Sequence, residues 1–485
     1  MKLHPSCSNP GRLLLASLPL LVAFSGCTMV GPPPSARPAP TLERPAPQDA
    51  PSPATVADPP PQGRPATAAV LPPRTTGDAG RIAPLTFSEV RALWVVRTAL
   101  SHPDSARAMV RRADEAGFNT LIVQVRGRGD AYYGSRWEPR SHTLANRPRD
   151  FDPLDVVLRE AHVRGIHVHA WVNTHLIASA NVLPDDPDHL LHRRPDLLAV
   201  PRELARELYT LDPRDPRYVD ALVRWTRQNA DRVEGLYTNP AHPEVREHMY
   251  SLWMDLLERY PLDGIHFDYI RYATPDFDYS RESLLRFREW MIPRLAADRI
   301  RELDRSMGAD PLTYPLAYPA EWGDFRREQN TRLVERIYFG VKKRRPAALV
   351  SAAVFANAAD AYGARYQEWE RWLRSGIVDV VAPMAYTTED GVFAEQIRTA
   401  VAAAGDGGRV WAGIGVYRNS FGGTMSKIGI ARGEGAGGIV LFSYDWTVQR
   451  EGISAAGGPY LPRIRDEAFH APVSAGVPVP APVRR

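Results

Sequence analysis

The sequence predicts an α/β fold in which eight parallel strands close into a (β/α)8 TIM barrel with insertions at its catalytic rim. Short apolar segments recur along the chain, and helical periodicity separates most of them. Such near-continuous apolar strands are typical of a parallel sheet that is buried on both faces. Eight repeats favour a closed barrel, and the absence of a glycine-rich loop after the first strand argues against a dinucleotide-binding sheet.

The strands and helices can be placed individually. The expected strands are Ala92–Val96, Thr120–Arg126, His167–Asn173, Gly264–Ile270, Val350–Phe355, Val378–Tyr386, Val410–Tyr417 and Gly438–Tyr444. Apolar residues at helical spacing lie between them, for example Ala106, Val110 and Ala113 after the first strand. Gly117 and Gly165 fall just past expected helix ends, where a left-handed closing residue is favoured.

Two long excursions interrupt this alternation. Residues Thr174–Pro243 separate the third strand from its helix, and Ala273–Trp322 follow the fourth strand. Both leave from the carboxyl ends of strands, which is the end where barrel enzymes carry their chemistry. We expect them either to wall a groove at this rim or to be surface insertions.

The first 27 residues predict an export signal. Lys2 and Arg12 precede the apolar stretch Leu13–Phe24, which is too short to cross a bilayer. Small residues just before Cys27 form a lipobox-like end, so we expect a lipid anchor on this cysteine. Phe24 stands where leucine is usual, which leaves plain secretory cleavage open.

Composition divides the rest of the chain. The 45 prolines are concentrated toward the two ends, and residues 28–84 hold too few large apolar side chains to build a core, which predicts a disordered linker. The folded domain is expected at 85–470 and a disordered tail at 471–485. An anchored domain on such a linker is expected in the cell envelope, facing the periplasm, with the outer membrane as its membrane.

Charge and motifs exclude several classes of function. The net charge is only +4, and without a basic stripe interleaved with aromatics we expect no nucleic-acid partner. No Gly-x-Ser-x-Gly elbow for a serine nucleophile is present. Cleavage before Cys27 would leave that cysteine alone, so no disulfide is expected. His167 and His169 share a strand face, but their spacing does not predict zinc, and we expect no metal and no cofactor.

The fourth expected strand ends in a carboxylate. Ile265 and Phe267 lie on one face of this strand, whereas His266 and Asp268 lie on the other. A lone aspartate at this position more often caps a helix or pairs with a residue such as Arg271. Polar and aromatic residues at the ends of the other strands favour a functional role instead.

Those strand-end residues are of a few chemical types. In chain order they are Trp94, Arg97, Gln124, Arg126, Asp130, His169, Trp171, Asn173, His266, Asp268, Asn357, Met384, Tyr386, Tyr417, Asn419, Tyr444, Asp445 and Trp446. Aromatic faces stack on sugar rings, amides and arginines bind hydroxyls, and a carboxyl group can protonate a leaving oxygen. Together they predict a glycosidase site.

Several motifs resemble, in the same order, those of the glycosyl-hydrolase-like 10 family. They are Arg91-Ala92-Leu93-Trp94-Val95, Gln124-Val125-Arg126, Gly129-Asp130-Ala131-Tyr132-Tyr133, His169-Ala170-Trp171-Val172-Asn173, Tyr237-Thr238-Asn239-Pro240, the run Asp263–Tyr272, Pro383-Met384-Ala385-Tyr386 and Leu441-Phe442-Ser443-Tyr444-Asp445. The resemblance covers about Val90 to Trp446. It implies a (β/α)8 barrel and an envelope lipoprotein, in a family with a member that cuts peptidoglycan strands stripped of their stem peptides.

A more distant resemblance concerns mechanism. The run Asp263–Asp268 is similar to the fourth-strand motif of family-18 chitinases, and Met384-Ala385-Tyr386 is similar to their sixth-strand motif. In those enzymes the acetamide group of the substrate is the nucleophile, and an aspartate and the tyrosine position it. Their catalytic glutamate falls at Ile270 here, so the acid must be another residue.

We therefore expect a glycoside hydrolase acting on N-acetylated glycan, with peptidoglycan, including peptide-free strands, as the expected substrate. Asp268 would be general acid or nucleophile, with Asp130 and Asp445 as candidate second carboxylates. Tyr386 and Asn173 would orient the acetamide or the reacting sugar. The expected substrate-binding residues are Trp94, Gln124, Arg126, His169, Trp171, Asn173, His266, Asn357, Tyr444 and Trp446.

Two other functions stay open. A non-catalytic glycan-binding lipoprotein of the envelope would use the same groove without cleaving its ligand. A metal-dependent deacetylase would be built on His169 and His266 instead. The residues also leave open whether a glycosidase here would use two carboxylates or the acetamide group of the substrate.

Overall fold

The structure is a computed structural model that describes residues 88–451 and 459–470. The predicted signal at 1–27 with Cys27, the linker at 28–84 and the tail at 471–485 lie outside these residues. The first residues of the predicted 85–470 domain lie outside them as well. The predictions for these segments therefore stay predictions.

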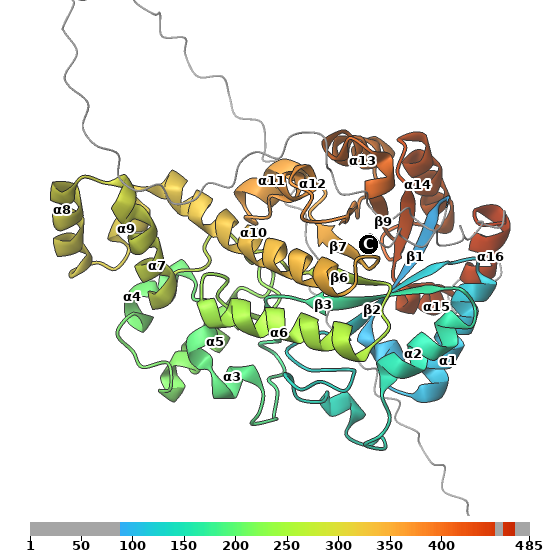
Figure 1. The fold of residues 1–485 in the computed structure, drawn as a ribbon, viewed down its shortest axis with the longest axis horizontal. Helices are drawn as coiled ribbons and strands as arrows, with labels where there is room; N and C mark the ends of the chain where they lie inside the picture. The colour runs from blue at the N-terminus through green and yellow to red at the C-terminus, as the bar shows by residue number, and fades with distance from the viewer. Residues whose placement is uncertain (1–87, 452–458, 471–485) are drawn as a thin grey trace, which may run out of the picture.

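Eight parallel strands form one ring, which confirms the predicted barrel (Figure 1). They are β1 (Val90–Val95), β2 (Thr120–Arg126), β3 (His167–Asn173), β6 (Gly264–Asp268), β7 (Leu349–Val354), β8 (Val380–Pro383), β9 (Trp411–Gly415) and β10 (Gly438–Phe442). Hydrogen bonding runs in the order β8-β7-β6-β3-β2-β1-β10-β9. Two isolated parallel bridges, Val381 with Val410 and Met384 with Gly413, join β8 to β9 and close the ring.

Helices cover the outside of the ring. Following the strands in turn, they are α1 (Pro103–Glu115), α2 (Pro153–His162), α6 (Pro243–Arg259), α10 (Pro319–Arg344), α11 (Ala358–Gly363) with α12 (Trp369–Arg374), α13 (Asp390–Ala404), α14 (Phe421–Gly433), and α15 (Tyr444–Glu451) with α16 (Tyr460–Glu467). Among the described residues, none of the helices combines the length and the apolar character needed to span a lipid bilayer.

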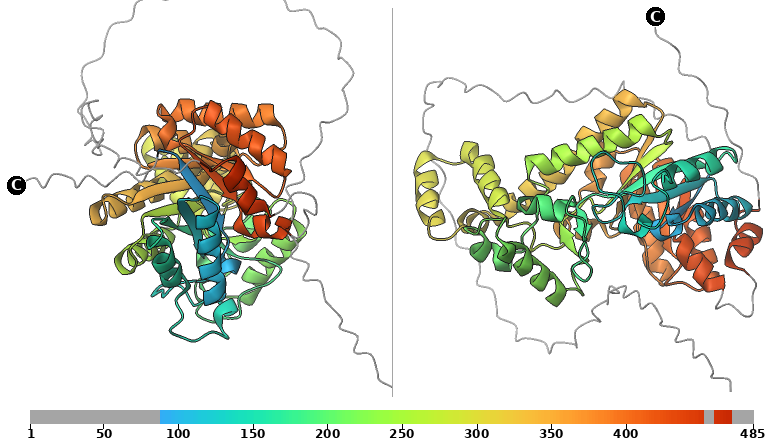
Figure 2. Two further views of the ribbon diagram at one scale, coloured as in Figure 1. Left: turned by 90° about the vertical axis from the view of Figure 1, so that its right-hand side faces the viewer. Right: turned by 90° about the horizontal axis from the view of Figure 1, so that it is seen from below.

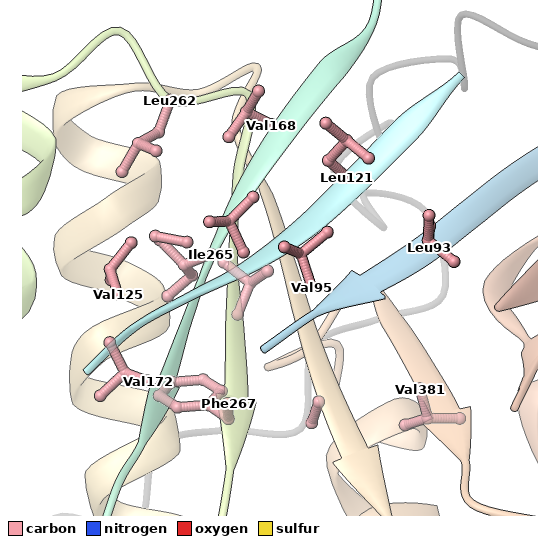
Figure 3. Close-up of a cluster of buried hydrophobic side chains, with 14 of the residues drawn as sticks. Leu93, Val95, Leu121, Val125, Val168, Val172, Leu262, Ile265, Phe267 and Val381 are labelled. Atoms are coloured by element: carbon pink, nitrogen blue, oxygen red, sulfur yellow. The ribbon is translucent and has the colours of Figure 1, made fainter. Parts of the chain in front are cut away.

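The two faces of each strand have different roles, as the alternation predicted. Leu93, Val125, Ile265 and Phe267 point outward and pack beneath the helices (Figure 3). Residues such as Trp94 belong to a separate apolar cluster inside the ring. Side chains of the inward set that follow the last apolar layer must therefore emerge at the carboxyl ends of the strands.

The two excursions contain structure of their own. The first holds β4 (Leu176–Ala178), α3 (Leu190–Arg193), α4 (Ala205–Leu208), α5 (Pro216–Gln228) and β5 (Leu236–Tyr237), and the second holds α7 (Arg281–Met291), α8 (Ala297–Met307) and α9 (Thr313–Ala317). Short 3-10 turns are η1 (Arg97–Leu100), η2 (His142–Leu144), η3 (Pro195–Leu197), η4 (Arg202–Leu204), η5 (Ile292–Arg294) and η6 (Gly407–Arg409). Both excursions lie on one side of the barrel, away from α1 and α16 (Figures 1 and 2).

Backbone and buried polar contacts join the two excursions. The N–H of Val200 donates to Asp278 Oδ1 at 2.7 Å, and the N–H of Tyr279 donates to the Val200 carbonyl at 2.8 Å. The rings of Trp225 and Phe277 pack edge to face with centroids 5.5 Å apart. We call this combined unit, residues 174–243 and 273–322, the insertion lobe.

Candidate active site

Neighbouring strands bring polar side chains together at the carboxyl end of the barrel. In the ladder between β3 and β6, Asn173 pairs with Asp268, and Trp171 pairs with His266. On the other side of β3, Trp171 pairs with Gln124 of β2. Because inward positions alternate with a period of two, Gln124, Trp171, Asn173 and Asp268 converge at one mouth of the ring.

Asp268 lies in this mouth and is only 9% exposed. Its Oδ1 accepts the N–H of Tyr269 at 2.7 Å. Burial raises the pKa of Asp268 to about 6, while the Tyr269 N–H and the Arg271 charge oppose this rise and the charge of Glu234 adds to it. Asp268 can therefore hold or release a proton near neutral pH.

Tyr386 follows β8 on the same mouth. Its ring packs against Phe442, Tyr417 and Trp94, with centroids 5.5, 5.9 and 6.3 Å away. Burial raises the pKa of Tyr386 well above its ordinary value, and the charges of Tyr417 and Asp268 add to the effect. Tyr386 therefore lies within electrostatic reach of Asp268, and its hydroxyl keeps its proton as a hydrogen-bond donor.

A network of amides fixes the neighbour of Asp268. Asn173 Oδ1 accepts Trp171 Nε1–H at 2.8 Å and faces Gln124 Nε2 at 3.4 Å, while Asn173 Nδ2 donates to the Gly127 carbonyl at 2.9 Å. Arg97 Nη1 donates to Gln124 Oε1 at 2.8 Å. Each amide thus has a defined orientation before any ligand arrives.

Trp94 and His266 form the layer below the mouth. Trp94 Nε1–H donates to His266 Nε2 at 3.2 Å, so the Nδ1 of His266 carries the proton and faces Ser351 Oγ at 2.9 Å. The hydroxyl of Ser351 donates to the Ile265 carbonyl at 3.0 Å. Burial lowers the pKa of His266 to about 3, so this histidine is neutral and supports the strand that ends in Asp268.

His169 lies deeper in the barrel. It is fully buried, and its ring packs against Trp411 at 5.5 Å and over Gly264, where an added Cβ would lie 2.6 Å from the ring. Burial lowers its pKa to about 3. Neither ring nitrogen has a hydrogen-bond partner among the described residues. The structure thus places His169, predicted as a substrate contact, in the barrel interior as a space-filling side chain.

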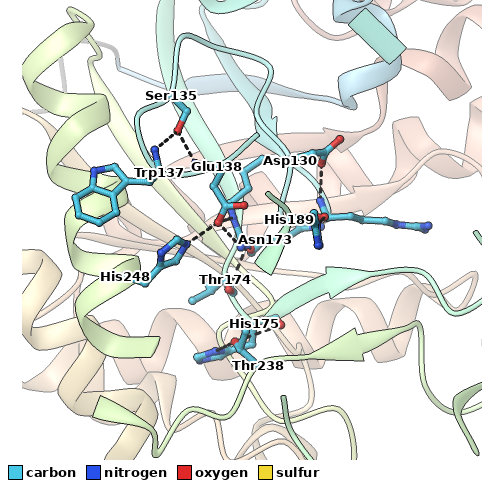
Figure 4. A network of polar contacts seen from close by, with 12 residues as sticks. Asp130, Ser135, Trp137, Glu138, Asn173, Thr174, His175, His189, Thr238 and His248 are labelled. Carbon is cyan, nitrogen blue, oxygen red and sulfur yellow. Dashed lines mark hydrogen bonds and ion pairs between the residues drawn. The ribbon is translucent and has the colours of Figure 1, made fainter. Parts of the chain in front are cut away.

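Arg126 is also placed below the surface. It is fully buried and pairs with Glu138, whose Oε1 also contacts His248 Nε2 at 2.7 Å (Figure 4). Arg126 also donates to the carbonyl of Asn173. Burial alone would raise the pKa of Glu138, but Arg126 and His248 outweigh burial and lower it to about 2. Arg126, predicted as a substrate contact, is thus held by protein groups and anchors the loop after β2.

The two predicted second carboxylates are bound to other groups. Asp130 is half-buried, and its Oδ1 accepts the N–H of Arg128 at 3.0 Å. Asp445 opens α15, and its Oδ1 accepts the hydroxyl of Thr98 at 2.7 Å. Burial raises the pKa of Asp445, although the Thr98 hydrogen bond opposes this. Both lie near strand ends, and each holds one protein group through its Oδ1.

The remaining predicted contacts are distributed. Trp446 stacks on Tyr417 with centroids 5.8 Å apart and extends the aromatic surface that begins at Tyr386. Tyr444 is mostly buried and faces Arg112 of α1 at 3.3 Å, on the outside of the barrel. Asn357 caps α11 by accepting the N–H of Asp360. The mouth therefore unites Gln124, Trp171, Asn173, Asp268, Tyr386 and Trp446, whereas Trp94, Arg126, His169 and His266 lie beneath it and Asn357 and Tyr444 lie elsewhere.

One acidic group near Asp268 was not predicted. Glu234 lies on the loop before β5, where its carboxylate accepts from Arg271 at 2.7 Å and from the hydroxyl of Tyr237 at 2.6 Å. The Arg271 guanidinium in turn lies 4.6 Å from the ring centre of Tyr269. Burial raises the pKa of Glu234, but Arg271 and Tyr237 lower it overall. The two acids, Glu234 and Asp268, thus have pKa values shifted in opposite directions.

Comparison with known proteins, like the geometry of the mouth, points to a glycosyl hydrolase-like protein. Residues 89–407 match the glycosyl hydrolase-like 10 family, which is two thirds of the chain. The chain belongs to this family.

Two curated relatives are named as glycosyl hydrolases. The chain is 27% identical over 301 residues to glycosyl hydrolase DigH of Escherichia coli strain K12, a match that covers 58% of each protein. It is 21% identical over 332 residues to glycosyl hydrolase YngK of Bacillus subtilis, covering 61% of this chain and 54% of that protein. The chain thus spans little more than half the length of these relatives.

Solved structures agree with the barrel fold of this glycosyl hydrolase-like 10 member. The glycoside hydrolase domain of PgaB (BpsB) from Bordetella bronchiseptica superposes with a TM-score of 0.51 at 16% identity, covering 76% of this chain and 98% of that one. The catalytic domain of β-amylase from Paenibacillus polymyxa also gives a TM-score of 0.51, at 11% identity, covering 79% and 98%. At these identities the similarity establishes the fold.

Position 270 separates this family member from the chitinase pattern. Ile270 is fully buried in the apolar layer under the helices, so no acid from this position reaches the mouth. In residues 88–451 and 459–470, no group of three histidine, cysteine or acidic side chains is arranged to hold a metal ion. Asp268 and Tyr386 instead lie at the mouth, with Glu234 close enough for its charge to act on Asp268.

Proposed function

We propose that this glycosyl hydrolase-like 10 member is a glycoside hydrolase that cleaves N-acetylated glycan, with peptide-free peptidoglycan strands as its substrate. One observation carries the proposal: Asp268 is buried in the mouth of a closed barrel, between fixed amides and a stacked aromatic surface. Sugar recognition needs such amides and ring faces, and glycosidic bond cleavage needs such an acid. The names of DigH and YngK support the same class of activity.

In this mechanism Asp268 is the general acid. Its pKa of about 6 leaves part of the enzyme protonated near neutral pH, which is what donation to a leaving glycosidic oxygen requires. Tyr386 keeps its proton and can hydrogen-bond the acetamide carbonyl of the sugar. Asn173, whose orientation is fixed by Trp171 and Gly127, lies beside Asp268 to hold the same sugar.

The acetamide group of the substrate is the nucleophile in this proposal. Both oxygens of Glu234 already accept hydrogen bonds from Arg271 and Tyr237, which leaves that carboxylate poorly placed to attack a sugar. In the first step the acetamide oxygen bonds to the anomeric carbon, the glycosidic bond breaks and the proton of Asp268 moves to the leaving oxygen. In the second step ionised Asp268 takes a proton from the water that opens the cyclic intermediate.

The test compares wild type with Asp268→Asn on glycan strands that an amidase has stripped of peptides. We expect new reducing ends with wild type and a rate about 10²- to 10⁴-fold lower with the variant, measured by mass analysis of released fragments. Asp298→Asn is the matched control, because its side chain is 91% exposed on α8. Equal rates for Asp268→Asn and wild type would remove Asp268 from the chemistry.

The same experiment separates the rival function. A wild-type protein that retains the strands without producing new ends would be a glycan-binding protein of the envelope. The buried Ile270 in place of the chitinase glutamate is the observation that keeps this alternative in view.

We also propose that the protein acts in the cell envelope, anchored through a lipid on Cys27 and facing the periplasm from the outer membrane. The apolar stretch Leu13–Phe24 and the small residues before Cys27 support this. The proline-rich residues 28–84 would then give the barrel reach toward the glycan layer.

A further inference from the structure

Two arginines lie at the mouth of the barrel without an acidic partner. Arg97 follows β1 and Arg128 follows β2, and both are half-buried. Neither guanidinium lies within 4.0 Å of a carboxylate in residues 88–451 and 459–470, although ion pairs hold many other arginines of the chain. Arg97 donates to Gln124, whereas the Arg128 side chain has no hydrogen-bond partner among those residues.

The backbone is shaped to admit one of these side chains. Arg97 crosses directly over Gly127, where an added Cβ would lie 2.6 Å from Arg97 Cδ and 2.7 Å from its Nε. The absence of a side chain at position 127 therefore lets Arg97 reach Gln124. It also places Arg97 beside the residue that precedes Arg128.

The two cations act on each other and on the site. Burial lowers the pKa of Arg128, and the positive charge of Arg97 lowers it further, while Tyr269 and Asp130 oppose both. The charges of Asp130 and Asp445 act on Arg128 and Arg97, respectively, without an ion pair in the described part of the chain. Each acid accepts a hydrogen bond, Asp130 from the Arg128 N–H and Asp445 from Thr98. Asp445 Oδ2 has no hydrogen-bond partner among the described residues.

Arg128 lies close enough to Tyr269 for its charge to act on the phenol of that residue. The backbone N–H of Tyr269 in turn donates to Asp268. Arg97 connects through Gln124 to Asn173, the strand neighbour of Asp268. A sugar held by Asn173 beside Asp268 would therefore present its substituents to both guanidinium groups.

We propose that Arg97 and Arg128 form a subsite for a carboxylate carried by the sugar, on the ring carbon next to the one that bears the acetamide group. Half-buried guanidinium groups without acidic partners favour an anionic ligand group. Their planar N–H forks match the two oxygens of a carboxylate. The site would thus select glycan whose sugar carboxylates are free and reject strands in which a peptide occupies them as amides.

The inference rests on the proposed function and names the substrate group that this same site recognises. Its test uses three glycans: amidase-stripped strands with free carboxylates, the same strands converted to methylamides, and neutral N-acetylglucosamine oligomers. The full chain and its Arg97→Gln and Arg128→Gln variants are compared, with Arg159→Gln as control because that residue is 79% exposed on α2. Arg128→Lys keeps the charge and removes the fork.

We expect conversion to methylamides to lower kcat/KM of the wild type by about 10- to 100-fold, the usual size of a charge-assisted contact. Arg128→Gln should lower kcat/KM by a similar factor on strands with free carboxylates. On methylamide strands it should have no further effect, because the contact between arginine and carboxylate is already absent there. Arg159→Gln should match wild type on all three glycans. Thermal unfolding of each variant verifies that it is folded.

Binding separates this inference from the proposed function. Affinity for each glycan is measured by titration of the Asp268→Asn protein, which does not depend on turnover. If strands bind in a carboxylate- and Arg128-dependent way but are never cleaved, the subsite stands and the hydrolase proposal fails. If methylamide strands bind and react as well as free ones, or Arg128→Gln weakens all three glycans equally, the carboxylate subsite is wrong.

Discussion

At the scale of one residue, opposing interactions set the pKa of Asp268. Burial favours its neutral form and outweighs the Tyr269 N–H and the Arg271 charge. Ionising this buried acid at neutral pH lowers the free energy of unfolding. The fold thus loses some stability because the reaction requires an acid with a raised pKa.

We therefore predict that Asp268→Asn stabilises the protein in alkaline solution. The folded-state pKa is raised from 3.8 to about 6, so the contribution of Asp268 to stability is complete below pH 3.8 and is lost as pH rises through 6. The variant should gain about 3 kcal/mol in free energy of unfolding at pH 8 and little at pH 4. Urea unfolding at both pH values measures this, and a variant less stable than wild type at pH 8 would contradict it.

Glu234 should set the pH range of the reaction. For an acid that must be protonated, kcat/KM falls as pH rises through the pKa of Asp268. The charge of Glu234 raises that pKa and the charge of Arg271 lowers it. Glu234→Gln removes the negative charge of Glu234 and leaves the positive charge of Arg271 in place, so the pKa of Asp268 should fall. We therefore expect the decline in kcat/KM to occur at lower pH in this variant, with Glu234→Asp closer to wild type. A decline that stays in place for Glu234→Gln would show that this charge does not act on the catalytic acid.

At the scale of one element, a buried cluster of charged side chains holds the loop after β2 in place. The loop after β2 is fixed to α6 through Arg126, Glu138 and His248. A buried carboxylate held by a cation and a histidine is costly to disrupt, because removing one charge leaves the other buried without compensation.

Glu138→Gln should accordingly destabilise the fold in a pH-dependent way. The pKa of Glu138 is lowered from 4.5 to about 2, so its stabilising contribution is present above pH 4.5 and is lost as pH falls through 2. We expect a loss of about 3–5 kcal/mol at pH 7 and a smaller difference from wild type near pH 2, measured by denaturant unfolding. Glu395→Gln, with a side chain 68% exposed on α13, serves as the control.

The strands illustrate what the sequence alone can predict. Period-two alternation placed β2 and β3 with the observed bounds and put Asn173 and Asp268 on inward positions. The strands predicted for β6, β8, β9 and β10 ran past the observed ends. For β6 the reason is the positive φ of 50° at Tyr269, and for β8 it is the turn at Pro383. Gly117 and Gly165 do close helices with positive φ, as predicted.

Depth and loop contacts could not be predicted in this way. Alternation assigns a face but not a layer, so His169 and His266 share the face of Asp268 and yet lie beneath it. Glu234 lies on a loop with no periodicity, and only folding brings it to Arg271. Arg126 ends a strand as a sugar-binding residue would, but its partner Glu138 lies in an irregular segment.

The whole molecule combines a barrel with the insertion lobe. Cavities of about 480 and 160 Å³ lie in that lobe, lined by residues such as Arg288 and Trp322, whereas the candidate chemistry lies at the strand ends. The insertion lobe packs on itself through Val200 and Asp278. The barrel therefore provides Asp268 and its neighbours, while the lobe contributes Glu234, which pairs with Arg271 beside them.

At this scale we predict that Cys27→Ala releases the protein from membranes. If the thiol of Cys27 carries the lipid, the variant loses the anchor while the folded domain is unchanged. Labelled palmitate should be incorporated by wild type only, and cell fractionation should move the variant to the soluble envelope fraction. Incorporation into Cys27→Ala, or a wild type without label, would contradict the anchor.

The barrel is joined least extensively between β8 and β9, and this should make that part of it the most mobile. Seven neighbouring pairs of strands are joined by ladders, whereas among the described residues β8 and β9 meet only through the bridges at Val381 and Met384. Amide protons along this seam should exchange with deuterated water sooner than those of β2 and β3. Tyr386 lies just after β8, so local opening between β8 and β9 would make the tyrosine side of the mouth more mobile. The side that carries Asp268 would stay fixed, because β6 is paired with β3 and with β7.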